Sequence, residues 1–188
     1  AFSPLVDPSY IEACVRRHYA PLLDPYFDEF LSAHYPDGVR FTVDGGELEK
    51  RAWLEDEGAP LAVRLPRKRK PSAVGYLARE ESPLPEERRG LAISTFGKVI
   101  KRGWEWLGVT PDAPELVGGL IEAPGLAECL TLDKGDFIRS GQRGVLYLSY
   151  RKAIQEAVAR QLAEWGDLRD RRERERRRAA GPVERDIE

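Results

Sequence analysis

Apolar side chains recur every three to four residues in the first part of the chain and at every second residue in its middle. The first spacing is typical of a helix with one apolar face, and it covers residues 8–34. The apolar positions of this segment are Ile11, Val15, Tyr19 and Leu22, followed by Phe27, Phe30 and Leu31.

Two helical pieces are expected in this segment rather than one. Ser9, with Glu12 three residues later, predicts a capping box at the start of the first piece. Pro21 is expected to interrupt or kink that piece, because proline lacks the N–H that a helix interior uses. Asp24 followed by Pro25 predicts a new start, with an N-cap and a proline at the first helical position.

Alternation of apolar and polar residues predicts short β-strands from residue 39 onward. The clearest is a hairpin in which residues 91–96 and 99–101 are joined by a turn at Gly97-Lys98. Residues 116–123 are a further candidate, which Gly118-Gly119 weakens. Other strands are expected at 39–43, 47–51, 61–65 and 74–78.

A long amphipathic helix is predicted at residues 146–165, after a charged, glycine-bearing loop at 131–144. The order of helix, several strands and long helix predicts an α+β fold: a mostly antiparallel sheet with helices on one face and a long C-terminal helix. We expect one α+β domain over residues 1–165, of which 1–38 form a leading helical segment. Residues 166–188 are expected to be a charged helical extension or linker.

Composition narrows the function classes. The chain has 188 residues, and 30 basic against 32 acidic side chains leave a net charge of −2, which excludes a globally basic nucleic-acid binder. No run of about 18 or more apolar residues occurs, so no membrane span is expected, and no secretion leader is visible. A cytoplasmic protein is the expectation. Methionine is absent even at position 1, which favours a piece of a longer protein.

The motifs of the chain argue against an autonomous enzyme. There is no phosphate loop, no dinucleotide fingerprint and no nucleophile elbow. Cys14 and Cys129 are expected to be buried free thiols rather than a disulfide. Asp133 and Asp136 flank Lys134 without the further oxygen ligands of a calcium loop, so no metal site is expected.

Two features are candidates for contact with nucleic acid. Trp104 and Trp106 alternate, so one is expected in the core and the other at an interface or rim. The other feature is a basic loop with five positive charges in seven residues, which can bind phosphates or be simply a solvated connection between strands. Its members are Arg64, Arg67, Lys68, Arg69 and Lys70.

Two motifs resemble segments of the GHKL ATPases, which include MutL, DNA gyrase B, topoisomerase VI B and the ninety-kilodalton heat-shock chaperones. Residues 93–100, with the sequence ISTFGKVI, resemble the strand, Asn-Gly-Arg, strand hairpin of their transducer domain. Residues 131–139, with the sequence TLDKGDFIR, resemble the His-Pro-Ala-Lys-x-Glu-Val-Arg loop of MutL but lack its His-Pro. Residues 91–165 are also similar to bacterial heat-shock-chaperone-like ATPases. The resemblance covers residues 40–165.

The resemblance implies a fold like the second domain of small-subunit ribosomal protein five. It implies a transducer, or middle, domain that couples ATP binding in an N-terminal nucleotide-binding domain of the same chain to dimer or client contacts. Lys134 is then the residue that meets the γ-phosphate, and Arg139 is the second candidate. ATP, Mg and a homodimer are implied for the full-length protein. The nucleotide-domain motifs are absent here, so this chain alone is expected to hold no ATP.

The alternative is a nucleic-acid-binding module of the same fold. It would use the basic loop at 64–70 and the tryptophans, with bases stacked on the indole rings.

Overall fold

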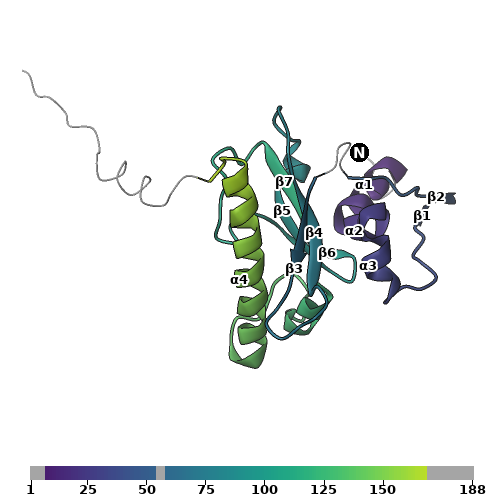
Figure 1. The fold of residues 1–188 in the computed structure, drawn as a ribbon. Helices are drawn as coiled ribbons and strands as arrows, with labels where there is room; N and C mark the ends of the chain where they lie inside the picture. Colours follow the sequence, from purple (N-terminus) through teal and green to yellow (C-terminus); the bar gives the residue numbers. More distant parts are fainter. Residues whose placement is uncertain (1–6, 54–57, 169–188) are drawn as a thin grey trace, which may run out of the picture.

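A computed structural model describes residues 7–53 and 58–168 of the protein. Figure 1 shows three layers: short helices near the N-terminus, a central sheet, and a long helix on the far side of that sheet. The helices are α1 (Pro8–His18), α2 (Ala20–Leu23), η2 (Pro25–Phe27), α3 (Asp28–Ser32), η3 (Glu86–Arg88), η4 (Pro124–Cys129) and α4 (Gly141–Glu164). The strands are β1 (Thr42–Val43), β2 (Gly46–Glu47), β3 (Ala59–Val63), β4 (Ala73–Arg79), β5 (Gly90–Thr95), β6 (Lys98–Gly103) and β7 (Val117–Glu122).

The main sheet of the described chain has the strand order β3-β4-β7-β5-β6. Strand β7 pairs antiparallel with β4 and parallel with β5, while the β3–β4 and β5–β6 pairs are antiparallel. The sheet is therefore mixed, although most of its pairs are antiparallel. The α+β class is confirmed.

The register brings three connections to one end of the sheet. Glu122, the last residue of β7, lies opposite Val74 at the start of β4 and opposite Ser94 near the end of β5. The β3–β4 connection, the β5–β6 turn and the β7–α4 connection therefore share this end. The basic loop and the loop that contains Lys134 belong to two of these connections.

Helices cover both faces of the sheet, because its central strands are apolar on both sides. On one face, Ile154, Val158 and Leu162 of α4 are fully buried in a cluster with the sheet residues Leu77, Leu91, Ile93 and Ile121. On the other face, Phe27 and Leu31 pack in a cluster with Tyr76, Ala92 and Leu120. The helices that were expected on one face are the short N-terminal helices. The long C-terminal helix α4 covers the opposite face. Each large apolar side chain contributes roughly 1.5–3 kcal/mol by its burial.

The N-terminal caps differ in part from the expectation. The predicted capping box at Ser9 is wrong: Asp7 is the N-cap, and its Oδ1 accepts a hydrogen bond from Ser9 N at 2.9 Å. The cap lies there because Pro8 takes the first turn of α1. The predicted cap at Asp24 is confirmed, since its Oδ1 accepts from Tyr26 N at 3.0 Å.

The predicted β5–β6 hairpin is confirmed, with its turn one residue earlier than expected. The turn residues are Phe96 and Gly97, with φ of 50° and 80°. Positive φ at both positions matches the right-handed twist of the flanking strands. The strand expected at 39–43 is reduced to β1, which pairs only with β2.

Trp104 and Trp106 are both buried, at 6% exposure each, so the expectation of one core and one rim residue is wrong. They follow β6 in a turn, and the two-residue period of a strand does not apply there. Trp106 Nε1 donates to Leu91 O at 2.9 Å.

Strand β7 lies at the centre of the sheet although it contains two glycines. Gly118 is required because the chain at Arg88 and the Trp53 ring approach the strand closely there. A Cβ on Gly118 would lie 2.3 Å from Arg88 O and 3.2 Å from the Trp53 ring. Glycine is therefore needed at this position rather than merely tolerated.

The two cysteines are free thiols: Cys129 is buried as expected, whereas Cys14 is only half-buried. None of the helices described here is both long and apolar enough to cross a bilayer. Asp167 still packs on the domain, where its Oδ1 accepts from Ala113 N at 3.0 Å. Of the extension predicted at residues 166–188, the part from residue 169 onward lies outside the described residues.

Candidate functional site

The loop between η4 and α4 is anchored at both of its ends. Leu130 and Phe137 form an antiparallel bridge, and Ile138 N donates to Cys129 O at 2.7 Å. The buried ring of Phe137 stacks on Tyr147 of α4, with 4.9 Å between ring centroids. The loop is therefore closed at its base beside η4 and packed against the second turn of α4.

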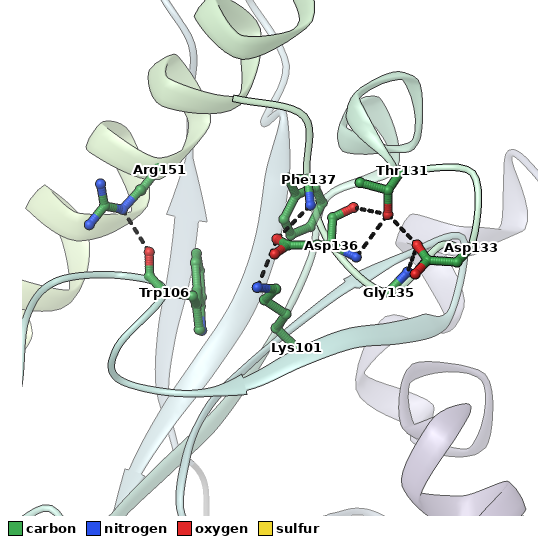
Figure 2. A network of polar contacts seen from close by, with 8 residues as sticks. All are labelled: Lys101, Trp106, Thr131, Asp133, Gly135, Asp136, Phe137 and Arg151. Carbon is green, nitrogen blue, oxygen red and sulfur yellow. Dashed lines mark hydrogen bonds and ion pairs between the residues drawn. The ribbon is translucent and has the colours of Figure 1, made fainter. Parts of the chain in front are cut away.

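Thr131 and Asp133 brace the inside of this loop, as Figure 2 shows. The Thr131 hydroxyl donates to Asp133 Oδ1 and accepts from Asp136 N at 3.1 Å. Gly135 N donates to the same Asp133 oxygen at 3.1 Å. The bond from the Thr131 hydroxyl, followed by that from Gly135, lowers the pKa of Asp133 below its ordinary value. Both groups favour the ionised carboxylate, so the brace persists at neutral pH.

Asp136 ties the loop to the edge strand of the sheet. Its Oδ1 lies 2.7 Å from Lys101 Nζ on β6 and accepts from Phe137 N at 2.6 Å. The Lys101 contact is the largest cause of the lowered pKa of Asp136. The carboxylates of Asp133 and Asp136 thus bind groups of the protein itself.

Lys134, the predicted nucleotide contact, is at the tip of this braced loop. Its backbone has a φ of 55°, and its N–H donates to Thr131 O at 2.9 Å. A non-glycine residue in this region costs roughly 1–3 kcal/mol, so the surrounding hydrogen bonds must hold it there. The side chain is exposed, and its ammonium group has no ion pair within the described chain. Leu132, two residues earlier, is fully exposed.

Arg139, the second candidate, lies just before α4 and is also exposed. It lines a shallow hollow of about 320 Å³ with Lys101, Arg102, Glu105 and Trp106. Arg151 of α4 fixes the wall of this hollow, because its Nε donates to Trp106 O at 2.6 Å. Arg139 therefore lies beside β6 and shares the loop with Lys134.

The five residues of the basic loop lie in the β3–β4 connection and are all exposed. The connection is held by its backbone: Ser72 N donates to Val63 O at 2.8 Å and Lys68 N to Leu65 O at 3.1 Å. None of the five side chains has an ion pair with another described residue. The register places this loop at the same end of the sheet as the Lys134 loop, so the two segments that carry the predicted site residues share that end.

A buried carboxylate at the same end, Glu122, was not predicted from the sequence. Its Oε2 accepts from Ser94 Oγ at 2.6 Å and from Gly97 N at 3.0 Å, while Oε1 has no partner. Burial raises the pKa of Glu122 from 4.5 to about 7. The sequence feature that could have indicated it is an acidic residue at the end of an otherwise apolar strand segment, VGGLIE.

The chain matches no known family, no curated protein and no solved structure. Its own residues are therefore the basis for inferring a function.

Proposed function

We propose that this chain is the transducer domain of a GHKL-type ATPase, in which Lys134 meets the γ-phosphate of ATP held by an N-terminal nucleotide-binding domain of the same protein. One observation carries the proposal: Lys134 is held with a positive φ on a braced loop, while its ammonium group is exposed and unpaired in the described chain. A structure that maintains backbone strain at an exposed lysine is typical of a functional position.

The charge of a lysine suits a sensor of nucleotide state. An ammonium group is a compact point charge, and its attraction to a triphosphate is stronger than to a diphosphate. The hydrogen bonds around Thr131 and Asp136 fix the backbone in advance, so docking orders little more than one side chain.

The braced loop is joined directly to a rigid element. Helix α4 has 24 residues, which corresponds to a length of about 36 Å. The stack of Phe137 on Tyr147 ties the loop to this helix by packing as well as by the chain. A pull on Lys134 is therefore transmitted along α4 to dimer or client contacts.

The exposed Leu132 supports a loop that meets another protein surface. A fully exposed leucine beside the lysine gains nothing from solvent, whereas docking against a second domain would bury it.

The test uses the protein expressed from its complete reading frame. Lys134→Ala should lower ATP turnover at least about tenfold, since one charge-assisted contact is worth roughly 1.5–3 kcal/mol. Lys152→Ala is the matched control, because Lys152 is a 77% exposed lysine on α4 with only a 4.0 Å contact to Glu156. Wild-type turnover in Lys134→Ala and Arg139→Ala alike would overturn the proposal, as would a reading frame without a nucleotide-binding domain. Loss in Arg139→Ala alone would move the role to the arginine.

The second candidate function is nucleic-acid binding by the basic loop. Its support is the five exposed, unpaired side chains at residues 64–70, which share one end of the sheet with Lys134 and Arg139. Replacing Arg67, Lys68, Arg69 and Lys70 by alanine should weaken duplex DNA binding and flatten its salt dependence. The log–log slope should fall by about 0.9 for each DNA phosphate that the variant no longer neutralises. Unchanged binding and slope would exclude this function.

A further inference from the structure

A second polar pocket lies on the face of the sheet opposite α4. It has a volume of about 440 Å³ and lies between α1, the segment after β2, η3 and strand β6. We call it the Arg102 pocket. Its defining residues are Arg17, Arg51, Trp53, Arg88 and Arg102. It shares no residue with the loop at 131–139.

Arg102 is half-buried, whereas Arg17, Arg51 and Arg88 are exposed. It lies on β6 opposite Ala92, and its Nη1 makes only long contacts, at 3.4 Å to Gly90 O and 3.5 Å to Arg88 O. Burial lowers the pKa of Arg102 to about 10; Tyr76 opposes this effect, the charges of Arg17 and Arg88 add to it, and the charge of Glu87 opposes it. Like charges therefore converge on a guanidinium that water solvates poorly.

The described carboxylates near the pocket form no ion pair with its four arginines. Asp24 is occupied: it accepts from Tyr76 Oη at 2.6 Å, from Tyr26 N at 3.0 Å and from Trp53 N at 3.4 Å. Glu87 lines the pocket but forms no ion pair with Arg102. Within the described chain, Arg17, Arg51, Arg88 and Arg102 thus have no acidic partner at ion-pair distance.

Trp53 holds two of the guanidinium groups in place. The centroid of its ring lies 5.1 Å from Arg102 Cζ and 5.6 Å from Arg88 Cζ. The ring is positioned by contact with Gly118 and by Tyr76, whose ring centroid is 6.1 Å away. Arg51 N donates to Leu23 O at 2.9 Å, which fixes the chain before the indole. Arg88 and Arg102 are therefore ordered before any ligand arrives, and ligand binding costs less entropy.

We propose that the Arg102 pocket binds a phosphate group, either as inorganic phosphate or as the terminal phosphate of a small ester. Planar guanidinium groups match the geometry of phosphate and form paired hydrogen bonds with it. A phosphate dianion supplies the charge that the described carboxylates do not. The volume exceeds that needed by the phosphate alone, so an attached organic group also fits.

The test is a titration of the 188-residue chain with inorganic phosphate at constant ionic strength. Binding is measured by calorimetry and by the shifts of the indole N–H signals in nuclear magnetic resonance. The variant Trp53→Phe assigns the Trp53 signal. We expect that signal to move saturably in the millimolar range or below. Arg102→Met and Arg17→Met should each weaken binding at least about tenfold. Arg17 is exposed, so its variant also reports if Arg102→Met fails to fold.

Arg160→Met is the matched control, because Arg160 is an exposed arginine on α4, which covers the opposite face of the sheet. It should bind phosphate as the wild type does. A non-saturable response of the wild type would overturn the proposal, as would a loss in Arg160→Met with wild-type binding in Arg17→Met. A comparison with glycerol phosphate separates the two sources: equal affinity indicates a site for phosphate alone, and tighter binding of the ester indicates that the rest of the pocket is used.

Discussion

Replacing Glu122 by glutamine should remove a pH dependence from the stability of this domain. The carboxyl group is completely buried, and one of its oxygens has no hydrogen-bond partner. Burial raises its pKa from 4.5 to about 7, and the hydrogen bonds from Ser94 and Gly97 offset only part of that effect. An ionised carboxylate in this position therefore destabilises the folded state.

The sign and size of the effect follow from proton linkage. Between pH 4.5 and about pH 7 the folded protein holds a proton on Glu122 that the unfolded chain has released. The stability from this group is thus fully present below pH 4.5 and is lost as the pH rises through about 7. The rise from 4.5 to about 7 corresponds to about 3 kcal/mol in the free energy of unfolding. Most of this contribution is lost between about pH 5 and about pH 8.

The assay is urea unfolding followed by tryptophan fluorescence across this pH range. The free energy of unfolding of the wild type should fall by about 2–3 kcal/mol more than that of Glu122→Gln. Glu115→Gln, which changes an exposed carboxylate, should keep the wild-type profile. Ser94→Ala should shift the fall to higher pH, because it removes a hydrogen bond that lowers the pKa. Parallel profiles of the wild type and Glu122→Gln would refute the reasoning.

Three further predictions test the core, the loop brace and the absence of a complete nucleotide site. Ile154→Ala should lower the free energy of unfolding by about 2–5 kcal/mol, because Ile154 is fully buried. Leu132→Ala, at a fully exposed position, should change it by less than about 0.5 kcal/mol. Urea titration measures both values, and equal losses would contradict the packing described. Lys101→Met should increase hydrogen exchange at the Asp136 amide by about two- to fivefold, as expected for the loss of a partly exposed ion pair, and an unchanged rate would show that the pair does not hold the loop. The chain alone should neither hydrolyse Mg-ATP nor bind it at micromolar concentration, because it lacks the nucleotide motifs; calorimetry and phosphate release measure this, and micromolar binding would contradict it.

Local patterns predicted most of the fold. The β5–β6 hairpin, the cap at Asp24 and the long helix α4 depend on short-range periodicity and turn chemistry, which the sequence displays directly. Tertiary contacts decided the rest. Strand β6 ends at Gly103, before Trp104 and Trp106, so the alternation of faces along a strand does not apply to these two residues, and both are buried.

The two candidate sites differ in how visible they are in the sequence. The Lys134 loop is one continuous segment, so its residues could be singled out from nine consecutive letters. The Arg102 pocket is assembled from α1, η3, β6 and the chain before residue 54, and no spacing in the sequence connects these pieces. Only the strand register and the close approach of Trp53 to Gly118 bring its arginines together.

Strand β6 contributes to both sites through adjacent residues. Lys101 lies opposite Ile93, which faces α4, and reaches Asp136 of the Lys134 loop. Arg102 lies opposite Ala92, which faces the N-terminal helices, and lines the Arg102 pocket. The two residues thus occupy positions on opposite faces of one edge strand, although both also line the hollow beside Arg139. Lys101→Met should therefore leave phosphate affinity unchanged if the strand is a fixed support. A change in that affinity would show that β6 moves as a unit, and loop engagement and phosphate binding would then be coupled reciprocally.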